Sequence, residues 1–260
     1  MPYTPRSQDK FQLGRISSAR ALASQPLRAF TSIPSAPVAF DPLKGANPFE
    51  MLGNGPDPTL TVNSGQAVGD CGFVMSVNAN IVTSYLTGEP FITPSSNEVV
   101  TAYLTYNNGQ DIGVENAKLF PYWRSHGLWG NKILGYGQVN HFDFDEAMDY
   151  AYAFGGLCTG IVVTSDMENA TLRHEPWERS TRYQILGGHD VFVFGRMDKD
   201  TGVLATWGQR QLFTRGWWET HVQEADAIIT YELGEKKGDT LGIDLPKLQA
   251  MIKESESESE

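Results

Sequence analysis

Two residues far apart in the 260-residue sequence have the types and settings that nucleophilic catalysis requires. Cys71 stands in "GDCGF", where a glycine-rich irregular stretch changes into a helical pattern of apolar residues. A helix N-terminus and a neighbouring imidazole each lower the pKa of a thiol, and the thiolate is the reactive form. Cys71 meets the first condition, and the flanking Gly69 and Gly72 let a substrate backbone come close. The second condition requires a histidine from elsewhere in the fold.

His189 is the candidate for that imidazole. In "ILGGHDVFVFG" it follows two glycines and opens a strongly apolar run, whereas the other four histidines lie in polar loops, at a helix end or in a polar helical stretch. A cysteine–histidine pair attacks a carbonyl carbon with the thiol as nucleophile, and the imidazole acts first as general base and then as general acid. The residue types therefore favour a thiol nucleophile with a histidine partner.

The order of Cys71, "GGH" and "TWG" along the chain resembles that of the papain-like cysteine peptidases. In that family the histidine opens a strand in a "GHAV"-like context, and "LATWG" is similar to the family's "NSWG" strand. The separation of Cys71 and His189 is slightly below the ~130–150 residues usual in the family. The motifs "MLGN…VGDCGF", "GGHDV" and "TWGQ…WWE…EADAIITYEL" are similar to a branch encoded by bacteriophages and some bacteria, over roughly residues 50–235.

The resemblance implies a role for each matching residue. Cys71 is the expected nucleophile, and its backbone N–H is expected to donate to the tetrahedral oxyanion. His189 is the expected general base, and Trp207 matches the tryptophan that shields the pair. Gly72, where the family prefers an aromatic residue, and Gly188 are expected to border the substrate.

The second oxyanion donor of the family is a glutamine shortly before the cysteine. Gln66 is the candidate here, although it lies one residue closer to Cys71 than the family pattern has it. Asn63 is the fallback, and a turn explains Gln66 almost as well. The sequence leaves these alternatives open.

The chain departs from the family at the residue that orients the histidine. Aligning "ATWG" with "NSWG" puts Ala205 in place of the family's asparagine. Alanine has no side-chain group that can hydrogen-bond to the imidazole and fix its orientation. Thr206 is one position away and faces the other side of the strand. A carboxylate such as Asp190 or Glu224, a backbone carbonyl or water are the alternatives. Loss of an orienting residue weakens catalysis without abolishing it.

Two functions from different classes are therefore expected. The first is a papain-like cysteine hydrolase with an altered third catalytic residue. The second is a papain-like scaffold that no longer performs chemistry and serves as a structural or minor virion protein. In both cases a phage origin is the expectation from the local motifs.

The pattern of apolar residues predicts the elements that must position Cys71 and His189. Helical periodicity runs through four segments of the first half: "CGFVMSVNANIVTSYL", "NEVVTAYLTYN", "GVENAKLFPYWRSHG" and "DFDEAMDYAYAF". A break is expected at Pro121, and Asp143 is expected to cap the fourth helix. Short β-branched and aromatic runs follow: "TGIVVTS", "HDVFVFGRM", "GVLATWG" and "ADAIITYEL". This order predicts an α+β chain, and the resemblance implies the two-lobed papain-like form, with Cys71 in the helical half and His189 in the β-sheet or barrel half.

Composition divides the chain into three parts. Residues 1–62 are rich in proline, and residues 1–50 have three more basic than acidic side chains although the whole chain is acidic, so we expect an extended arm, with a disordered tail as the equal alternative. Residues 63–235 form the expected papain-like domain. Residues 236–260 end in "KESESESE", which predicts a disordered tail. Residues 1–50 are expected to make few contacts with their own hydrophobic core, and the arm is expected either to lie along the acidic body of the chain or to reach a neighbouring subunit.

The net charge of −11 disfavours binding to nucleic acid through phosphates or to an anionic membrane. No segment has the length of apolar sequence that spans a bilayer, and no secretory signal is visible. Neither a metal nor a cofactor is expected, and the expected partners are a peptide or protein substrate and other virion subunits. We expect a protein that is cytoplasmic at synthesis and then virion-associated.

Three further residues have expectations of their own. Cys158, in "GGLCTGIVV", is expected to be a small buried residue. Trp217 and Trp218 are expected to lie half in the core and half at an interface. If the hydrolase interpretation is right, the sulfur of Cys71 should lie within about 4 Å of a ring nitrogen of His189.

Overall fold

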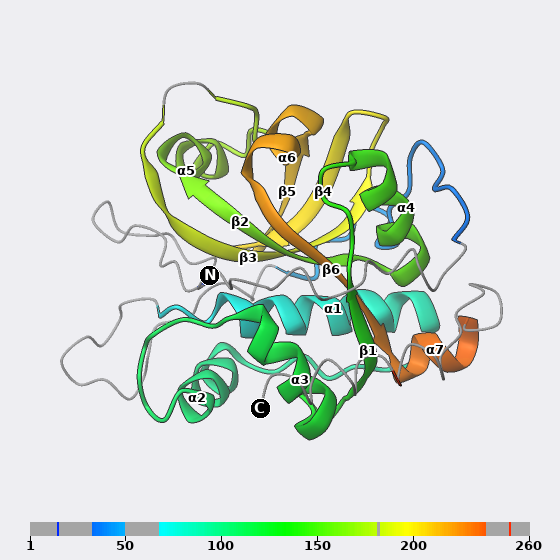
Figure 1. Cartoon of the computed structure of the whole chain (residues 1–260), viewed down its shortest axis with the longest axis vertical. Helices are drawn as coiled ribbons and strands as arrows, with labels where there is room; N and C mark the ends of the chain where they lie inside the picture. Colours follow the sequence, from blue (N-terminus) through cyan, green and yellow to red (C-terminus); the bar gives the residue numbers. More distant parts are fainter. Residues whose placement is uncertain (1–14, 16–32, 50–67, 181–182, 238–249, 251–260) are drawn as a thin grey trace.

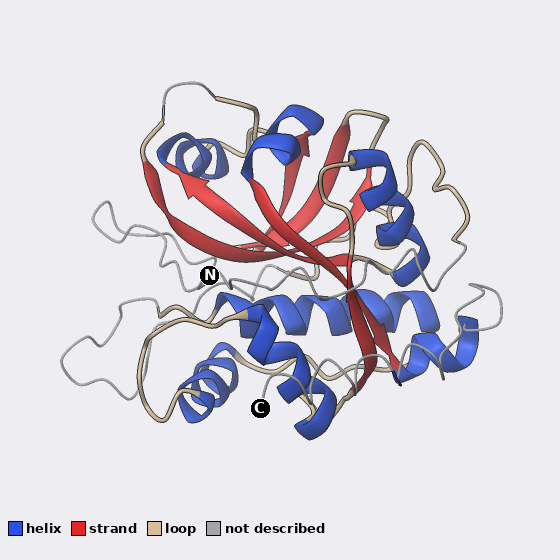
Figure 2. Ribbon diagram, viewed as in Figure 1, coloured by secondary structure: helices blue, strands red, loops and turns tan. Residues whose placement is uncertain are grey.

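The computed structural model describes Arg15 and residues 33–49, 68–180, 183–237 and 250. Helices of the first half precede most of the strands of one antiparallel sheet, so the chain is α+β (Figures 1 and 2). The helices are α1 (Cys71–Thr87), α2 (Ser96–Tyr106), α3 (Asn116–His126), α4 (Phe144–Phe154), α5 (Ser165–Leu172), α6 (Arg215–His221) and α7 (Tyr231–Lys237). The strands are β1 (Ile133–Gln138), β2 (Leu157–Thr164), β3 (Ile185–Arg196), β4 (Thr201–Thr206), β5 (Gln209–Thr214) and β6 (Val222–Thr230).

The sheet brings together strands from both ends of the second half of the chain. Its order is β1-β6-β2-β3-β4-β5, and every neighbouring pair is antiparallel. The last long strand, β6, therefore lies between β1 and β2, while β3 and β4 are direct neighbours. The predicted pairing of the "GGH" strand with the "TWG" strand is present.

Helix α1 is buried along most of its length, which its sequence explains. Apolar side chains recur every four residues from Phe73 to Ile81, and every residue from Cys71 to Thr83 is buried. Gly88 ends the helix in the left-handed conformation at φ 74°, which glycine adopts at no steric cost. In Figure 1 this helix crosses the molecule between the greater part of the sheet and the helices α2 and α3.

The other predicted helices begin at capping residues. Ser95 and Glu98 form a capping box at the start of α2, and the side chain of Asp143 accepts from the first backbone N–H groups of α4 as predicted. The break predicted at Pro121 is wrong, because α3 continues through that residue. Proline removes one donor from the helix, and burial of Phe120 and Trp123 on either side of it keeps the helix packed.

Two hydrophobic clusters cover the two faces of the sheet, and strand alternation assigns residues to each. Val191 and Val193 of β3 belong to the cluster that includes α4 and α6. Phe192 and Phe194, which alternate with them, belong to the cluster that includes α1, α2 and α3. We call these the α4 face and the α1 face of the sheet.

Several sequence expectations are corrected or confirmed by this packing. The segment "YEL" begins α7 instead of extending the last strand. Trp217 and Trp218 are both fully buried on the α4 face, so neither lies at a surface in this chain. Cys158 is fully buried in the other cluster, as predicted.

The described part of the N-terminal region contacts the core. Leu43 and Phe49 are buried in the cluster of the α1 face, and the backbone of Phe40 pairs with that of Arg196 at the end of β3. The expectation that residues 1–50 make few core contacts is therefore wrong for these residues. The predicted boundary at residue 62 and the Ser/Glu tail lie outside the described residues.

In the part of the chain that the structure describes, we find no helix that combines the length and the apolar character needed to cross a membrane.

Candidate active site

Cys71 is the first residue of α1, as the sequence predicts, and its residue is only 1% exposed. The backbone N–H groups of Phe73 and Val74 both donate to the carbonyl of Asp70, which closes the first turn. The thiol thus lies at the positive end of the helix dipole, where negative charge on the sulfur is stabilised.

The thiol of Cys71 has a hydrogen-bonding contact with the carboxyl of Asp190. The distance from Cys71 Sγ to Asp190 Oδ2 is 3.9 Å. A Cβ atom added at Gly72 would lie 3.3 Å from the same oxygen and at a similar distance from Leu119. The missing side chain at Gly72 therefore allows α1 to pack closely on β3 and α3, whereas from the sequence we expect Gly72 to border a substrate.

His189 lies in a fixed orientation beside two residues of the "TWG" motif. Its Nε2 is 2.7 Å from Thr206 Oγ1, and its ring stacks on the indole of Trp207 with centroids 4.6 Å apart and planes 18° apart. Among the described residues, Nδ1 of His189 has no hydrogen-bond partner. Burial lowers the pKa of His189 to about 3, so the ring is neutral at neutral pH.

A two-residue turn brings Trp207 onto that ring. Thr206 and Gln209 pair across the β4–β5 hairpin, and the intervening Trp207 and Gly208 have positive φ angles of 43° and 75°. This is the backbone of a type I′ turn, in which glycine is favoured and tryptophan is uncommon. The prediction that Trp207 covers the imidazole is confirmed by this geometry.

Thr206, and not Ala205, is the neighbour of the imidazole. Ala205 is buried on the α1 face, and the next residue of the strand points to the opposite side. The carboxylates considered as alternatives, Asp190 and Glu224, form no hydrogen bond with the ring of His189, because Nε2 is bonded to Thr206 and Nδ1 has no partner among the described residues.

No hydrogen bond joins Cys71 to His189 in this structure, contrary to the expected close contact. The alternation of β3 explains the difference, because Asp190 points to Cys71 on the α1 face and the preceding His189 points to the other face. The thiol therefore contacts the residue adjacent to the imidazole in the chain. The sulfur is directed at the carboxyl of Asp190, and the imidazole lies on the other face of the strand.

Asp190 belongs to a buried polar cluster that the sequence did not reveal. Asn116, at the start of α3, donates from Nδ2 to Asp190 Oδ1 at 2.8 Å and to Glu224 Oε1 at 2.9 Å. The guanidinium of Arg15 lies 3.1 Å from Glu224 and 3.7 Å from Asp190. Burial, and then the charge of Glu224, raise the pKa of Asp190 against the opposing effect of Arg15, to about 7. Nothing in the local sequence marks Asn116 or Arg15 as members of such a cluster, because their partners lie about 75 to 210 positions away.

The remaining predicted site residues divide into two groups. Gly188 contacts Arg15, whose N–H donates to the carbonyl of Gly188 at 3.2 Å. Gln66 and its alternative Asn63 lie outside the described residues, so the second oxyanion donor stays a prediction.

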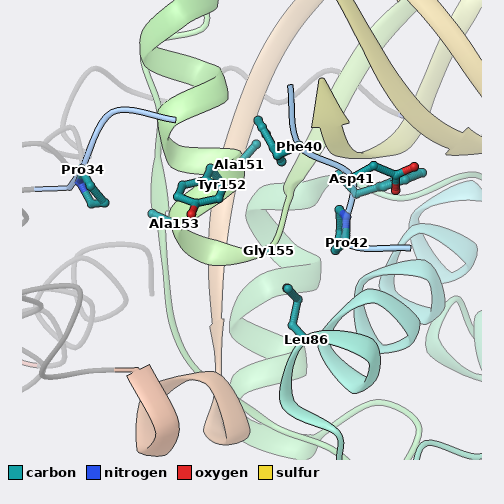
Figure 3. Close-up of a pocket in the computed structure, with 10 residues that line it drawn as sticks. Pro34, Phe40, Asp41, Pro42, Leu86, Ala151, Tyr152, Ala153 and Gly155 are labelled. Carbon is teal, nitrogen blue, oxygen red and sulfur yellow. The ribbon is translucent and has the colours of Figure 1, made fainter. Parts of the chain in front are cut away.

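The cavity of Figure 3 is separate from these residues. It has a volume of about 480 Å³ and is lined by Leu86 of α1, residues of α4 and a segment that includes Phe40 (Figure 3). Leu86 lies 15 residues after Cys71, or about 22 Å along a helix that rises 1.5 Å per residue. This cavity does not contribute to the candidate site.

Comparison with solved structures identifies the fold. Xylellain, a cysteine protease from Xylella fastidiosa, aligns with 88% of this chain and 99% of its own, with a TM-score of 0.59 and 13% identity. proCathepsin B S9 from Trypanosoma congolense aligns with 85% of this chain and 86% of its own, with a TM-score of 0.54 and 13% identity. No family model and no curated protein matches the sequence. The chain has the fold of the papain-like cysteine proteases.

Proposed function

We propose that this protein is a papain-like cysteine hydrolase that cleaves peptide or isopeptide bonds, with Thr206 in place of the usual orienting asparagine. The observation that carries the proposal is the setting of His189. Its ring is held through Nε2 by Thr206 and covered by Trp207, while Nδ1 has no partner among the described residues. A fixed imidazole with one available nitrogen is what a thiol nucleophile requires.

The first step of the proposed reaction is a proton transfer from the thiol to Nδ1. Because the sulfur contacts Asp190 while the ring of His189 lies on the other face of β3, this step requires the start of β3 to rearrange so that the ring reaches the thiol. With the Nε2 proton donated to Thr206 Oγ1, Nδ1 is the basic nitrogen of the neutral ring. The thiolate that forms raises the pKa of the imidazole from its low buried value, because opposite neighbouring charges favour each other.

The thiolate then attacks the carbonyl carbon of the substrate. A carbon–sulfur bond forms, and the carbonyl π electrons move to the oxygen, where the backbone N–H of Cys71 donates a hydrogen bond. Collapse of this intermediate breaks the carbon–nitrogen bond, and the leaving amine takes the proton from His189. Water, deprotonated by the same ring, hydrolyses the thioester and restores the thiol.

The names of the similar structures support peptide-bond chemistry, since xylellain is a cysteine protease. The two-lobed arrangement, the extended arm of residues 1–62 and a peptide or protein substrate belong to this proposal. The catalytic roles of Cys71, His189 and Thr206 belong to it as well.

A peptide library incubated with the full chain and read by mass spectrometry tests the proposal. We expect new termini with the wild type and none with Cys71→Ala. Cys158→Ala is the matched control, because that cysteine is fully buried in the core and has no proposed role. Cleavage by Cys71→Ala at the wild-type rate would contradict the proposal.

One observation favours a second function, a scaffold without catalysis. The thiol and the imidazole are not hydrogen-bonded, and the low pKa of His189 makes the ring a weak base in this arrangement. A phage origin and a structural role in the virion would accompany that function. Mass spectrometry of purified particles tests it, and absence of the chain at stoichiometric amounts would contradict it.

A further inference from the structure

The guanidinium of Arg15 lies in a buried pocket on the α1 face of the sheet. The Arg15 side chain is 2% exposed. Its Nε donates to Glu224 Oε1 at 3.2 Å, and its Nη2 lies 3.1 Å from the same oxygen. Its Nη1 donates to the side-chain oxygen of Gln223 at 2.6 Å. All three nitrogens of the guanidinium therefore have a partner, and Asp190 lies 3.7 Å from Nε.

The floor of this pocket is Gly160, which the register of three strands places between two acidic residues. Gly160 of β2 pairs with Asp190 of β3 on one side and with Glu224 of β6 on the other. A Cβ atom at position 160 would overlap the guanidinium of Arg15. The sheet thus leaves a gap the size of a side chain, with a carboxyl group on each side of it.

The charges of the pocket favour a cation. The side chains of Asp190 and Glu224 are 0% and 6% exposed, and Asn116 is their shared donor. Two acidic groups buried side by side are unfavourable unless a positive charge compensates them. The raised pKa of Asp190 agrees with a carboxyl that a cation compensates only in part.

The arrangement of acceptors favours a guanidinium over an ammonium group. Glu224 accepts from two nitrogens of one fork and Gln223 from the third. A lysine ammonium is a single point charge on a flexible stem and cannot reproduce a planar fork.

The backbone of Arg15 is bound in the manner of an extended peptide. Its N–H donates to the carbonyl of Gly188, and it forms a parallel bridge with Val114. A Cβ atom at Gly188 would lie 2.8 Å from the carbonyl oxygen of Arg15, so glycine is needed for this approach. The second oxygen of Asp190 is the one that contacts Cys71. One carboxyl group therefore joins the guanidinium pocket to the candidate nucleophile.

The geometry points to a subsite for arginine side chains formed by Asp190, Glu224, Gln223 and Gly160, occupied in this structure by the chain's own Arg15. Resting on the proposed hydrolase function, the inference names its substrate class as extended peptides with an arginine beside the scissile bond. Arg15 is then an internal ligand of this subsite, and its removal opens the pocket to an arginine from another chain.

Calorimetric titration of the full chain tests the inference. The protein carries Arg15→Ala, and also Cys71→Ala so that no turnover occurs. The ligands are acetyl-Gly-Arg-Gly-amide and the same peptide with lysine or with citrulline, the neutral isostere of arginine. We expect the arginine peptide to bind at least tenfold more tightly than either analogue. The Cys71→Ala chain that keeps Arg15 should bind the arginine peptide at least tenfold more weakly than the chain without Arg15.

A substitution of the pocket floor provides the matched control. Gly160→Ala, added to the titrated variant, places a Cβ in the space of the guanidinium and 2.8 Å from Glu224 Cγ without changing any charge, and should abolish the preference for arginine. Gly216→Ala should leave it intact, because a Cβ there meets only the side chain of Arg179 at an ordinary contact distance. Equal binding of the three peptides, no binding of any, or an unchanged preference after Gly160→Ala would each overturn the inference.

The variant Arg15→Gln keeps part of the stem and a hydrogen-bonding amide, and the titration is repeated with it. If both Arg15 variants lose the near-ultraviolet circular dichroism of the native protein, Arg15 is a structural residue and the inference is wrong. The two proposals fail separately. If the arginine peptide binds selectively but the chain with Cys71 does not hydrolyse it, only the hydrolase proposal is wrong. If the chain hydrolyses the arginine and citrulline peptides equally well, only the arginine subsite is wrong.

Discussion

The hydroxyl of Thr206 lies 2.7 Å from Nε2 of His189, on the side of β4 opposite to Ala205. The residue that aligns with the family's asparagine therefore cannot reach the imidazole, but its neighbour does. The alternation of one strand moves the orienting contact by one position in the sequence.

Thr206→Val should lower kcat and leave KM nearly unchanged. Valine keeps the shape of threonine but removes the hydrogen bond that fixes the ring, and such losses reduce general-base catalysis by roughly 10²-fold. Thr206→Ser, which keeps the hydroxyl, should retain most of the activity. Steady-state kinetics on a cleaved peptide measure both. Equal kcat values for the valine and serine variants would show that Thr206 does not orient His189.

Trp207→Ala should raise the pKa of His189 from about 3 towards its ordinary value near 6.5. Burial causes the low value, and the indole that stacks on the ring is part of that burial. Titration of the histidine ring protons by NMR gives the pKa directly. Trp207→Phe, which keeps an aromatic cover, is the control and should shift it less. A pKa that stays near 3 in the alanine variant would contradict the role given to Trp207.

The sequence was sufficient for the parts of the fold that depend on local patterns. The buried helix that begins at Cys71, the cap at Asp143 and the pairing of the "GGH" and "TWG" strands follow from periodicity and motif. The strands β1 and β5 were missed, because "ILGYGQ" and "QRQLFT" have too few apolar residues to stand out.

The candidate site was predictable only in part, because its contacts depend on tertiary structure. Cys71, His189 and Trp207 were found from their motifs, and Thr206 was one of several alternatives. Which side chain of β3 faces Cys71 depends on the packing of α1 against the sheet, and no local pattern reports this.

Asp190→Asn should change how stability depends on pH. In the folded chain the carboxyl of Asp190 keeps its proton up to about pH 7, whereas in the unfolded chain it releases the proton above about pH 4. Between these values each rise in pH favours the unfolded wild type. The free energy of unfolding of the wild type, relative to the variant, should therefore fall by about 1.4 kcal/mol per pH unit and level off above pH 7.

Urea denaturation of both proteins from pH 4.5 to pH 8 measures this difference. Groups that both chains share contribute equally and cancel in the comparison. If the free energy of unfolding of the wild type, relative to the variant, instead rises with pH, the charge of Arg15 lowers the pKa of Asp190 by more than burial raises it.

Phe49→Ala should destabilise the protein by roughly 3–5 kcal/mol. Phe49 is fully buried and lies against Phe194 of β3, with ring centroids 5.5 Å apart. Val38→Ala, at a position 66% exposed, is the control and should change the free energy of unfolding by less than about 0.5 kcal/mol. Thermal or urea unfolding measures both. Equal, small effects would show that the N-terminal region is not part of the folded core.

The rate at which iodoacetamide alkylates Cys71 tests the central claim most directly, which is that His189 activates this thiol. Peptide mass spectrometry follows Cys71 and Cys158 in one sample, and Cys158 serves as the unreactive control because burial raises its pKa well above the usual value. The rates are measured from pH 5 to pH 9 in the wild type and His189→Ala, each with and without Arg15→Ala. The account predicts that Cys71 reacts well below pH 8 in the wild-type site, at least tenfold faster than in His189→Ala, and faster still without Arg15. A Cys71 rate that follows an ordinary thiol with a pKa near 8.5, and that does not change in His189→Ala, would contradict it.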